Sequence, residues 1–471
     1  MINDNIDNVN KINSLRQAVA IDLDTELEEA AEPWRKIWRE HTELFNKTLS
    51  NVVIGGKHRI MRMANDSTTG GRIAYEFIQQ KDLMGVYQDT LIQTGVNKKD
   101  EPIYSDYITA WAKHSRSQVY RKGVIFMPGD RVPAGYFNTW RGFAVEPVES
   151  PDDVILIKHH IEEVICAGKQ EVIDYVYNWI AFSVQYPAIP VGTALVCRGD
   201  KGTGKGTLFR FLRDLWGQHG KHITSCEHLT GKFNAHLSDV CLLFVDEAFF
   251  SNDKKHEGVL KGLITEPTLM IERKGVDAVE CKNYLKIVMA TNSDWAIPAS
   301  KDERRYMVLD ATNDYVGNSD YFSSLIAETN SDKTQAAFLY EMLHRDISGF
   351  RPSRVPDTYG LRAQREHSLG SLQKWWMECI TRGCVTYSGD FEPLWDAEFN
   401  AKELRESYLV FCQENKVSGY DIATYNALGR YLRTLAVKKT RSNGYTRYQM
   451  GGLDEAMQRF SEMEKVNFDL D

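Results

Sequence analysis

Apolar runs in the middle of the chain predict short buried strands, and residues with a helical period flank them. Apolar residues fill positions 194–197 and 241–245 without alternation, and a third run, 285–290, is interrupted only by Lys286. Runs of this length are typical of strands covered on both faces, as in parallel sheets. Residues 175–185 and the segment beginning at 208 carry a helical period. These patterns predict an α/β core with mainly helical regions beside it.

A glycine-rich loop separates the first predicted strand from the helix that follows it. Gly199, Gly204 and Lys205 meet the spacing GxxxxGK, in which the backbone folds around a phosphate and the lysine contacts the β and γ phosphates. A serine or threonine usually follows the lysine, but Gly206 stands there, so Thr207 is predicted to be the hydroxyl ligand of Mg²⁺. We expect ATP to bind to Gly199, Gly202, Thr203, Gly204, Lys205, Gly206 and Thr207.

Polar residues beyond the second and third predicted strands indicate that the nucleotide is hydrolysed. Asp246 and Glu247 end the second strand, at the edge where ligands bind in open α/β sheets. We expect Asp246 to hold Mg²⁺ through water and Glu247 to polarise a water for attack on the γ-phosphate. Asn292 ends the third strand and is predicted to sense the γ-phosphate or to orient the attacking water. Arg304 and Arg305 follow and are candidate arginine fingers.

Three further segments give the chain a specific resemblance to known helicases. They are residues 121–128 (RKGVIFMP) followed by 136–143 (YFNTWRGF), the predicted helix at 175–185 that ends at Pro187, and residues 272–275 (ERKG). With the motifs above, the chain resembles the superfamily 3 helicases of the AAA+ class, and most closely the phage and poxvirus primase-helicase family, over residues 111–376. The resemblance implies an AAA+ type P-loop ATPase, a hexamer around single-stranded DNA, and a hairpin on which Lys274 contacts that DNA. Gly206 departs from the family pattern.

The expected function is that of an ATP-dependent DNA helicase from a phage or similar mobile element. Because Arg304 and Arg305 lie beyond the third strand, we do not expect them to reach their own γ-phosphate, so a neighbouring subunit is required. A separate primase or polymerase is an expected partner. Two alternatives stay open: an initiator or loader ATPase that does not unwind DNA, and a phosphotransferase. The second is favoured by Gly206 before Thr207 but disfavoured by the acids at 246 and 247.

The net charge of −8 does not itself suggest DNA binding, but the C-terminal region is locally basic. Between Asp421 and Asp454 there is no acid, while Arg430, Arg433, Lys438, Lys439, Arg441 and Arg447 lie there. Residues 426–435 predict a helix, and residues 437–448 predict two strands joined by a turn at 442–444. This order predicts a winged-helix-like domain in which Lys439, Arg441 and Arg447 contact duplex DNA. An ordinary basic surface is the alternative.

Composition and segments rich in glycine and proline indicate where the protein resides and how the chain divides into regions. The 471 residues include no apolar run near 18 residues, no secretion signal and no CxxC among eight cysteines, so we expect a cytoplasmic protein that does not span a membrane. We expect four regions: an N-terminal α+β region (1–110), a helical domain (111–187), the ATPase domain (188–350) and the winged-helix-like domain (351–471).

Overall fold

The computed structural model describes residues 32–66, 72–129, 131–247, 254–272, 278–385, 395, 398–442 and 445–467. The chain divides into two compact units, Met1–Arg141 and Gly142–Asp471. In the part of the chain that the structure describes, every helix is too short or too polar to cross a lipid bilayer. Lys274 lies outside the described residues.

The first unit is built on a four-stranded sheet with the order β3-β2-β1-β6. Its core contains Leu49, Ile60, Leu83, Ile108 and Trp111. Residues 111–141 belong to this unit, and beyond the end of α4 at Lys113 their regular elements are short strands rather than the helices expected from 111 onward. The elements are α2 (Pro33–Asn46), β1 (Leu49–Ile54), β2 (Lys57–Asp66), β3 (Arg72–Ile78), α3 (Gln80–Val86), β4 (Leu91–Val96), β5 (Pro102–Asp106), α4 (Tyr107–Lys113), β6 (Val119–Tyr120), β7 (Gly123–Ile125) and β8 (Tyr136–Asn138).

A five-stranded parallel sheet forms the centre of the second unit, in the order β10-β11-β14-β9-β15. The strands are β9 (Ala194–Arg198), β10 (Gly220–Ile223), β11 (Leu242–Asp246), β14 (Lys286–Thr291) and β15 (Tyr306–Asp310). The three strands predicted from the apolar runs are therefore confirmed to within about a residue at each end. The mixed α/β class is confirmed as well.

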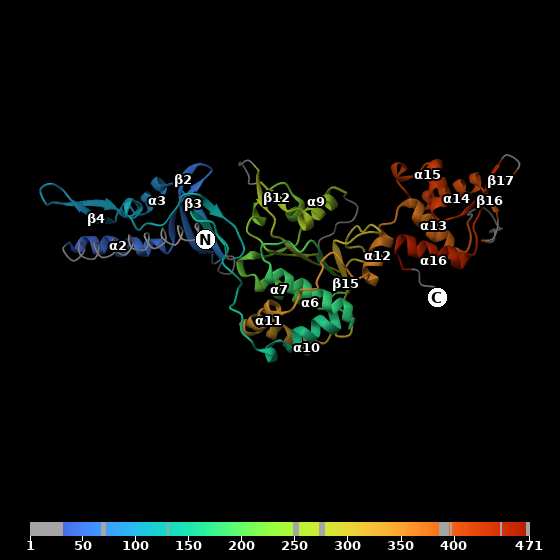
Figure 1. Cartoon of the computed structure of the whole chain (residues 1–471), viewed down its shortest axis with the longest axis horizontal. Helices are drawn as coiled ribbons and strands as arrows, with labels where there is room; N and C mark the ends of the chain where they lie inside the picture. Colours follow the sequence, from blue (N-terminus) through green and yellow to red (C-terminus); the bar gives the residue numbers. More distant parts are fainter. Residues whose placement is uncertain are drawn as a thin grey trace, which may run out of the picture. The chain divides into compact units, whose positions relative to one another are not determined.

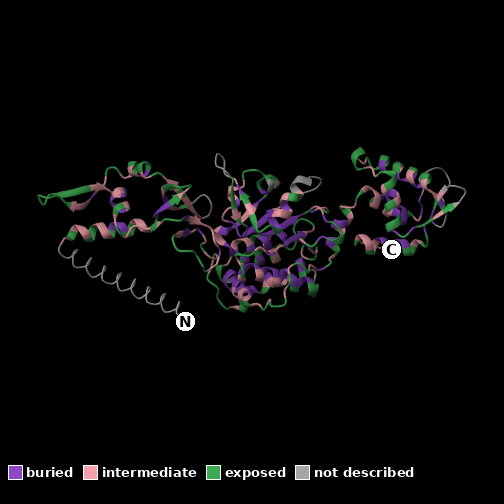
Figure 2. Ribbon diagram, turned by 45° about the horizontal axis from the view of Figure 1, so that its top comes forward, coloured by how far each residue is buried: buried purple, intermediate pink, exposed green. Residues whose placement is uncertain are grey.

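Helices cover both faces of this sheet, which explains why its strands carry no polar alternation. Helix α7 packs on β10, β11 and β14, and α10 and α11 pack on α7 (Figure 1). On the other face, Val245 and Met289 share a core with Leu260 of α9 and Leu361 of α12. Figure 2 shows the buried residues, in purple, gathered in this sheet and the helices around it. The helices are α5 (Ile155–His159), η3 (His160–Ile165), α6 (Gln170–Gln185), α7 (Lys205–Leu215), α8 (Cys226–Thr230), α9 (Lys254–Thr265), α10 (Ser319–Thr329), α11 (Asp332–His344) and α12 (Tyr359–His367).

Smaller elements complete this part of the chain. Strands β12 (Thr268–Ile271) and β13 (Val279–Lys282) pair antiparallel. The expected helix over 175–185 is part of α6, which begins at Gln170. Its Trp179 is fully buried and donates a hydrogen bond of 3.0 Å to the carbonyl of Thr193, just before β9. Helix α6 therefore fixes the start of the strand that leads into the glycine-rich loop.

The C-terminal residues form helices around a three-stranded antiparallel sheet with the order β16-β18-β17. The helix expected at 426–435 and the two strands expected at 437–448 are confirmed. Trp375, Trp376, Tyr408, Leu432 and Phe460 are among the buried residues that form one core here. The elements are α13 (Ser371–Arg382), β16 (Glu398–Asn400), α14 (Ala401–Glu414), α15 (Tyr425–Thr434), β17 (Lys438–Ser442), β18 (Tyr445–Gln449) and α16 (Leu453–Glu464).

Candidate functional site

The glycine-rich loop runs from the end of β9 to the start of α7, at the carboxyl edge of the parallel sheet. Gly202 and Gly204 both have φ of +85°, in the left-handed region that favours glycine. A Cβ on Gly204 would lie 2.4 Å from the ring of His160, so a larger residue does not fit there. The helix expected from 208 begins at Lys205 instead, which places Gly206 and Thr207 in its first turn.

Three predicted site residues from distant segments meet beside this loop. Lys205 Nζ donates to Asn292 Oδ1 at 3.1 Å, and Asn292 Nδ2 donates to Glu247 Oε1 at 2.9 Å. The order of the strands explains this meeting, because β14, which leads to Asn292, lies between β9 and β11. The amide of Asn292 can therefore reach both Lys205, which comes after β9, and Glu247, which comes after β11.

The ammonium group of Lys205 is held close to its own loop. Its Nζ also donates to the carbonyls of Gly199 at 2.8 Å and Asp200 at 2.7 Å, and to Thr203 Oγ1 at 3.1 Å. Burial lowers the pKa of Lys205 from its ordinary value, and nearby groups that include Asp200 and Glu247 oppose this shift. The ammonium group of Lys205 is thus desolvated and surrounded by hydrogen-bond acceptors of its own loop. An anion bound in the loop can take the place of these acceptors.

Glu247 has an uncommon backbone conformation for a residue with a side chain. Its φ is +55°, and its N–H donates to the carbonyl of Ala290 at 2.9 Å. Such left-handed residues cost free energy and gather at functional sites. The turn aims the carboxylate of Glu247 at Asn292, whereas Asp246, one residue earlier, still belongs to β11.

His222 lies beside Asp246, and no sequence motif gives it a role there. Its Nε2 lies 3.4 Å from Asp246 Oδ2, and its ring stacks on Phe244 with 4.6 Å between centroids. His222 pairs with Phe244 in the register of β10 and β11, which a single sequence does not reveal. The ring of His222 therefore stands beside the carboxylate of Asp246 on the neighbouring strand.

His160 is a second histidine that the sequence patterns do not point to. It begins the π-helical turn η3 and is fully buried. Its Nε2 lies 3.3 Å from the carbonyl oxygen of Gly204, and its Nδ1 lies 3.0 Å from the hydroxyl of Tyr321. Burial lowers the pKa of His160 to about 4. The ring is therefore neutral at neutral pH, so Nε2–H donates to Gly204 and Nδ1 accepts from Tyr321. His160 thus ties the glycine-rich loop to α10.

A cavity of about 370 Å³ opens over the loop. Its polar side includes Thr207 and Asp246, the two oxygen-bearing groups assigned to a divalent cation from the sequence. Its apolar side includes Phe322 and Ile326 of α10, and Ile326 is exposed although it is apolar. No sequence motif pointed to this apolar side of the cavity. The lining residues are Lys201, Gly202, Thr203, Gly204, Lys205, Gly206, Thr207, Arg210, Asp246, Glu247, Ala290, Thr291, Asn292, Phe322 and Ile326.

The two candidate arginine fingers lie in different environments. Arg305 pairs with Glu303 at 3.2 Å, and the carboxylate of Glu303 also accepts hydrogen bonds from the backbone N–H groups of Arg304 and Arg305. The side chain of Arg304 is exposed and forms no hydrogen bond or ion pair with another described residue. Both arginines precede β15, at the amino edge of the sheet, whereas the glycine-rich loop follows the carboxyl end of β9. They are therefore not neighbours of the loop in their own chain.

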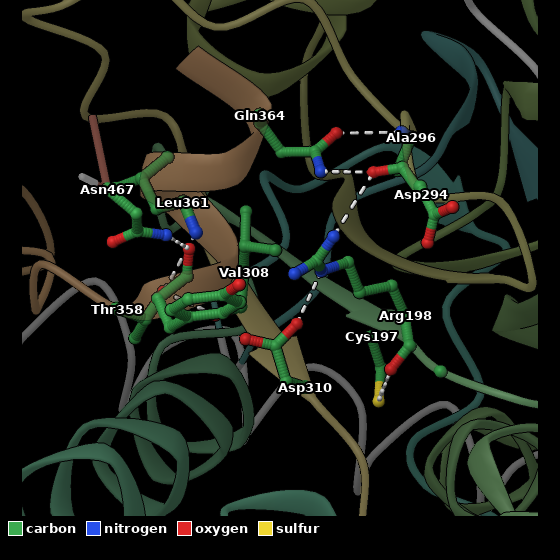
Figure 3. Close-up of polar contacts among 12 residues, drawn as sticks. Cys197, Arg198, Asp294, Ala296, Val308, Asp310, Thr358, Leu361, Gln364 and Asn467 are labelled. Carbon is green, nitrogen blue, oxygen red and sulfur yellow. Dashed lines mark hydrogen bonds and ion pairs between the residues drawn. The ribbon is translucent and has the colours of Figure 1, made fainter. Parts of the chain in front are cut away.

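Arg198, the last residue of β9, connects the loop to α12 (Figure 3). Its guanidinium pairs with Asp310 and donates to the carbonyl of Asp294 at 3.3 Å. Gln364 of α12 donates to the same carbonyl at 2.6 Å and is fully buried. The turn after β14 is therefore held from both sides.

The predicted DNA contacts of the C-terminal region are on the hairpin of β17 and β18. Lys439 and Arg441 are exposed on β17. Arg447 of β18 is exposed as well and pairs with Glu398 at 3.4 Å, so part of its charge is balanced.

Comparisons with known proteins relate the chain to a phage protein. Residues 197–305 match the model of a family described as "Family of unknown function (DUF5906)". The chain is 31% identical over 139 residues to the DNA primase-polymerase of Nitratiruptor phage NrS-1, a match that covers 29% of this chain but only 19% of that protein. An apo structure of the NrS-1 C-terminal region has a TM-score of 0.58 and 17% identity, covering 88% of this chain and 98% of the other. A second apo structure of the same region, in the A form, has a TM-score of 0.57 with the same identity and coverage. The chain shares the fold of that region.

Proposed function

We propose that this chain is an ATP-dependent DNA helicase motor of phage replication. The observation that carries the proposal is the hydrogen-bonded series from Lys205 through Asn292 to Glu247 at the mouth of the glycine-rich loop. It joins a cation suited to phosphates, a polar amide and a carboxylate suited to activating water. The primase-polymerase name of the NrS-1 relative supports a role in phage DNA replication.

The cavity offers a separate group for each part of ATP. The phosphates would lie on the backbone N–H groups at the start of α7, with Lys205 against the β and γ phosphates. Thr207 and Asp246 would hold Mg²⁺, which neutralises charge on the phosphates. Phe322 and Ile326 offer an apolar surface for the base. The strand β14 between β9 and β11 supports an AAA+ type core, since it brings Asn292 between the loop and the acids.

Hydrolysis then follows from the positions of Glu247 and Asn292. The Glu247 carboxylate would take a proton from a water as that water attacks the γ-phosphate. Asn292 keeps the carboxylate oriented and contacts Lys205, so it can report whether a γ-phosphate is present. The positive φ of Glu247 supports this role, because backbone strain is retained where a side chain must point in one direction.

A ring of subunits completes the proposed site. The five residues of β15 span about 13 Å, and Arg304 lies before the strand, so it is far from the loop of its own chain. An exposed arginine in this place can serve the nucleotide of a neighbouring subunit, whereas Arg305 is held by Glu303. We therefore assign the finger to Arg304 and expect a hexamer around single-stranded DNA, with Lys274 in the channel.

Release of inorganic phosphate from ATP, measured with and without single-stranded DNA, tests this function. We expect Mg²⁺-dependent release that single-stranded DNA stimulates in the wild type and that Lys205→Ala abolishes. Phosphate transfer to an acceptor with no free phosphate released would instead support a phosphotransferase.

A further inference from the structure

We propose that helix α15 reads bases in the major groove of duplex DNA, so that the chain recognises a particular duplex sequence. This goes beyond the proposed motor, which needs only single-stranded DNA and contacts to the phosphate backbone. It does not depend on nucleotide hydrolysis.

The first observation is the order of elements around α15. Helix α14 packs on α15, and the antiparallel hairpin of β17 and β18 follows directly, with β16 as the third strand of the sheet. Helix-turn-helix proteins place the second of two packed helices in the major groove. The position of α15 is that of this second helix.

The second observation is the division of α15 into two faces. Leu428 and Leu432 are buried and join the core of the C-terminal elements. Asn426, Arg430 and Arg433 follow at helical spacing and are exposed. Within the described part of the chain, no side-chain hydrogen bond or ion pair engages these three residues. Their polar groups are therefore free to meet a ligand.

The chemistry of this exposed face suits base edges as well as phosphates. An asparagine pairs through two hydrogen bonds with adenine, and an arginine pairs in the same manner with guanine. Lysines on an adjacent hairpin suit the backbone, and Lys439 of β17 and Arg441 are exposed there. The absence of acids between Asp421 and Asp454 in the sequence leaves nothing in this segment to repel DNA. We infer that the hairpin positions the duplex and α15 specifies its sequence.

Selection from a pool of random duplexes, with the full chain and no nucleotide, tests the proposal. We expect the wild type to enrich one sequence motif and to bind it at least ten-fold more tightly than a scrambled duplex. Asn426→Ala and Arg430→Ala should each reduce that preference about ten-fold. Because Asn426 is uncharged, Asn426→Ala should leave affinity for the scrambled duplex within about two-fold.

Two matched variants separate base reading from general charge. Arg382→Ala removes an arginine of α13 that pairs with Glu378 at 3.0 Å, and it should keep the preference. Lys439→Ala with Arg441→Ala should weaken binding to both duplexes equally and lower the log-log salt slope by about one unit for each contact. Circular dichroism spectra and melting curves that match the wild type ensure that each variant is folded.

Two results would overturn the proposal. One is that the wild type enriches no sequence. The other is that folded Asn426→Ala and Arg430→Ala keep the full preference for the enriched sequence. Neither result would bear on ATP hydrolysis, so failure of this proposal is distinguishable from failure of the proposed motor.

Discussion

Asn292 Oδ1 accepts a hydrogen bond of 3.1 Å from Lys205 Nζ, although the two residues lie 87 positions apart in the sequence. The same amide donates to Glu247, so one side chain touches the group proposed to hold phosphate and the group proposed to activate water. Loss of this amide should therefore affect hydrolysis more than nucleotide binding.

We predict that Asn292→Ala lowers kcat for ATP hydrolysis by roughly 100-fold, with little change in affinity for ATP. Removal of a positioned polar donor from an active site typically has an effect of this size. Steady-state phosphate release and binding of a fluorescent ATP analogue measure the two quantities. Asn330→Ala, at the exposed end of α10, is the control and should retain normal hydrolysis. A normal kcat in Asn292→Ala would contradict the role assigned to this residue.

The Mg²⁺ ligand is tested at Thr207. We predict that Thr207→Ala raises the Mg²⁺ concentration needed for half-maximal hydrolysis, because the first turn of α7 would lose its hydroxyl ligand. Thr265→Ala on α9 keeps the cavity intact and should leave the Mg²⁺ titration unchanged. If Thr207→Ala also gave an unchanged titration, another group would have to hold the ion.

The two arginines before β15 should behave differently. We predict that Arg304→Ala reduces ATP hydrolysis by about 10³-fold, the lower end of the range for arginine fingers. Arg305→Ala should instead lower stability, by about 1–3 kcal/mol, because it removes one partner of the fully buried carboxylate of Glu303. Equal loss of activity in both, with no loss of stability, would contradict this division.

Mixed rings test whether the finger acts on a neighbouring subunit. Lys205→Ala and the double variant Arg304→Ala, Arg305→Ala should each be inactive alone. Mixed together, they should recover part of the ATPase activity, since some junctions combine an intact loop on one subunit with an intact Arg304 on the next. Rings shown to be mixed but inactive would indicate that the arginines act within their own chain or only support the fold.

His160 predicts a pH dependence of stability. Its pKa is lowered to about 4 in the folded chain, against about 6.5 in the unfolded chain, so the unfolded state binds the additional proton between these values. Stability should therefore fall as the pH is lowered from 7 to 5. Urea titrations should show that this fall is smaller in His160→Gln by about 2 kcal/mol. A variant with the same pH dependence as the wild type would show that His160 does not carry this effect.

The sequence predicted the parts of the site that depend on local order. Apolar runs without alternation identified β9, β11 and β14, and the residues that end them were expected at the same edge of the sheet. The helix and hairpin of the C-terminal region followed from turn residues and periodicity. These predictions succeeded because each rests on a few consecutive residues.

The parts that the sequence did not predict depend on contacts between distant segments. His160 precedes Gly204 by 44 residues and reaches it only because of the packing of η3 and α10. His222 faces Asp246 through the register of two parallel strands. In the sequence, Phe322 and Ile326 cannot be distinguished from ordinary apolar positions of an amphipathic helix, so nothing marks them as residues that line the cavity. A helical region was expected from residue 111 onward, but residues 119–120 form β6, which pairs with β1 of the first unit.

Strand displacement from forked DNA tests the central claim most directly. With ATP and Mg²⁺, the wild type should release the labelled strand, while Glu247→Gln should bind ATP and DNA but release none, because it retains the phosphate contacts and loses the base that activates water. A wild-type chain that hydrolyses ATP in response to DNA without displacing the strand would contradict the account and support a non-unwinding ATPase.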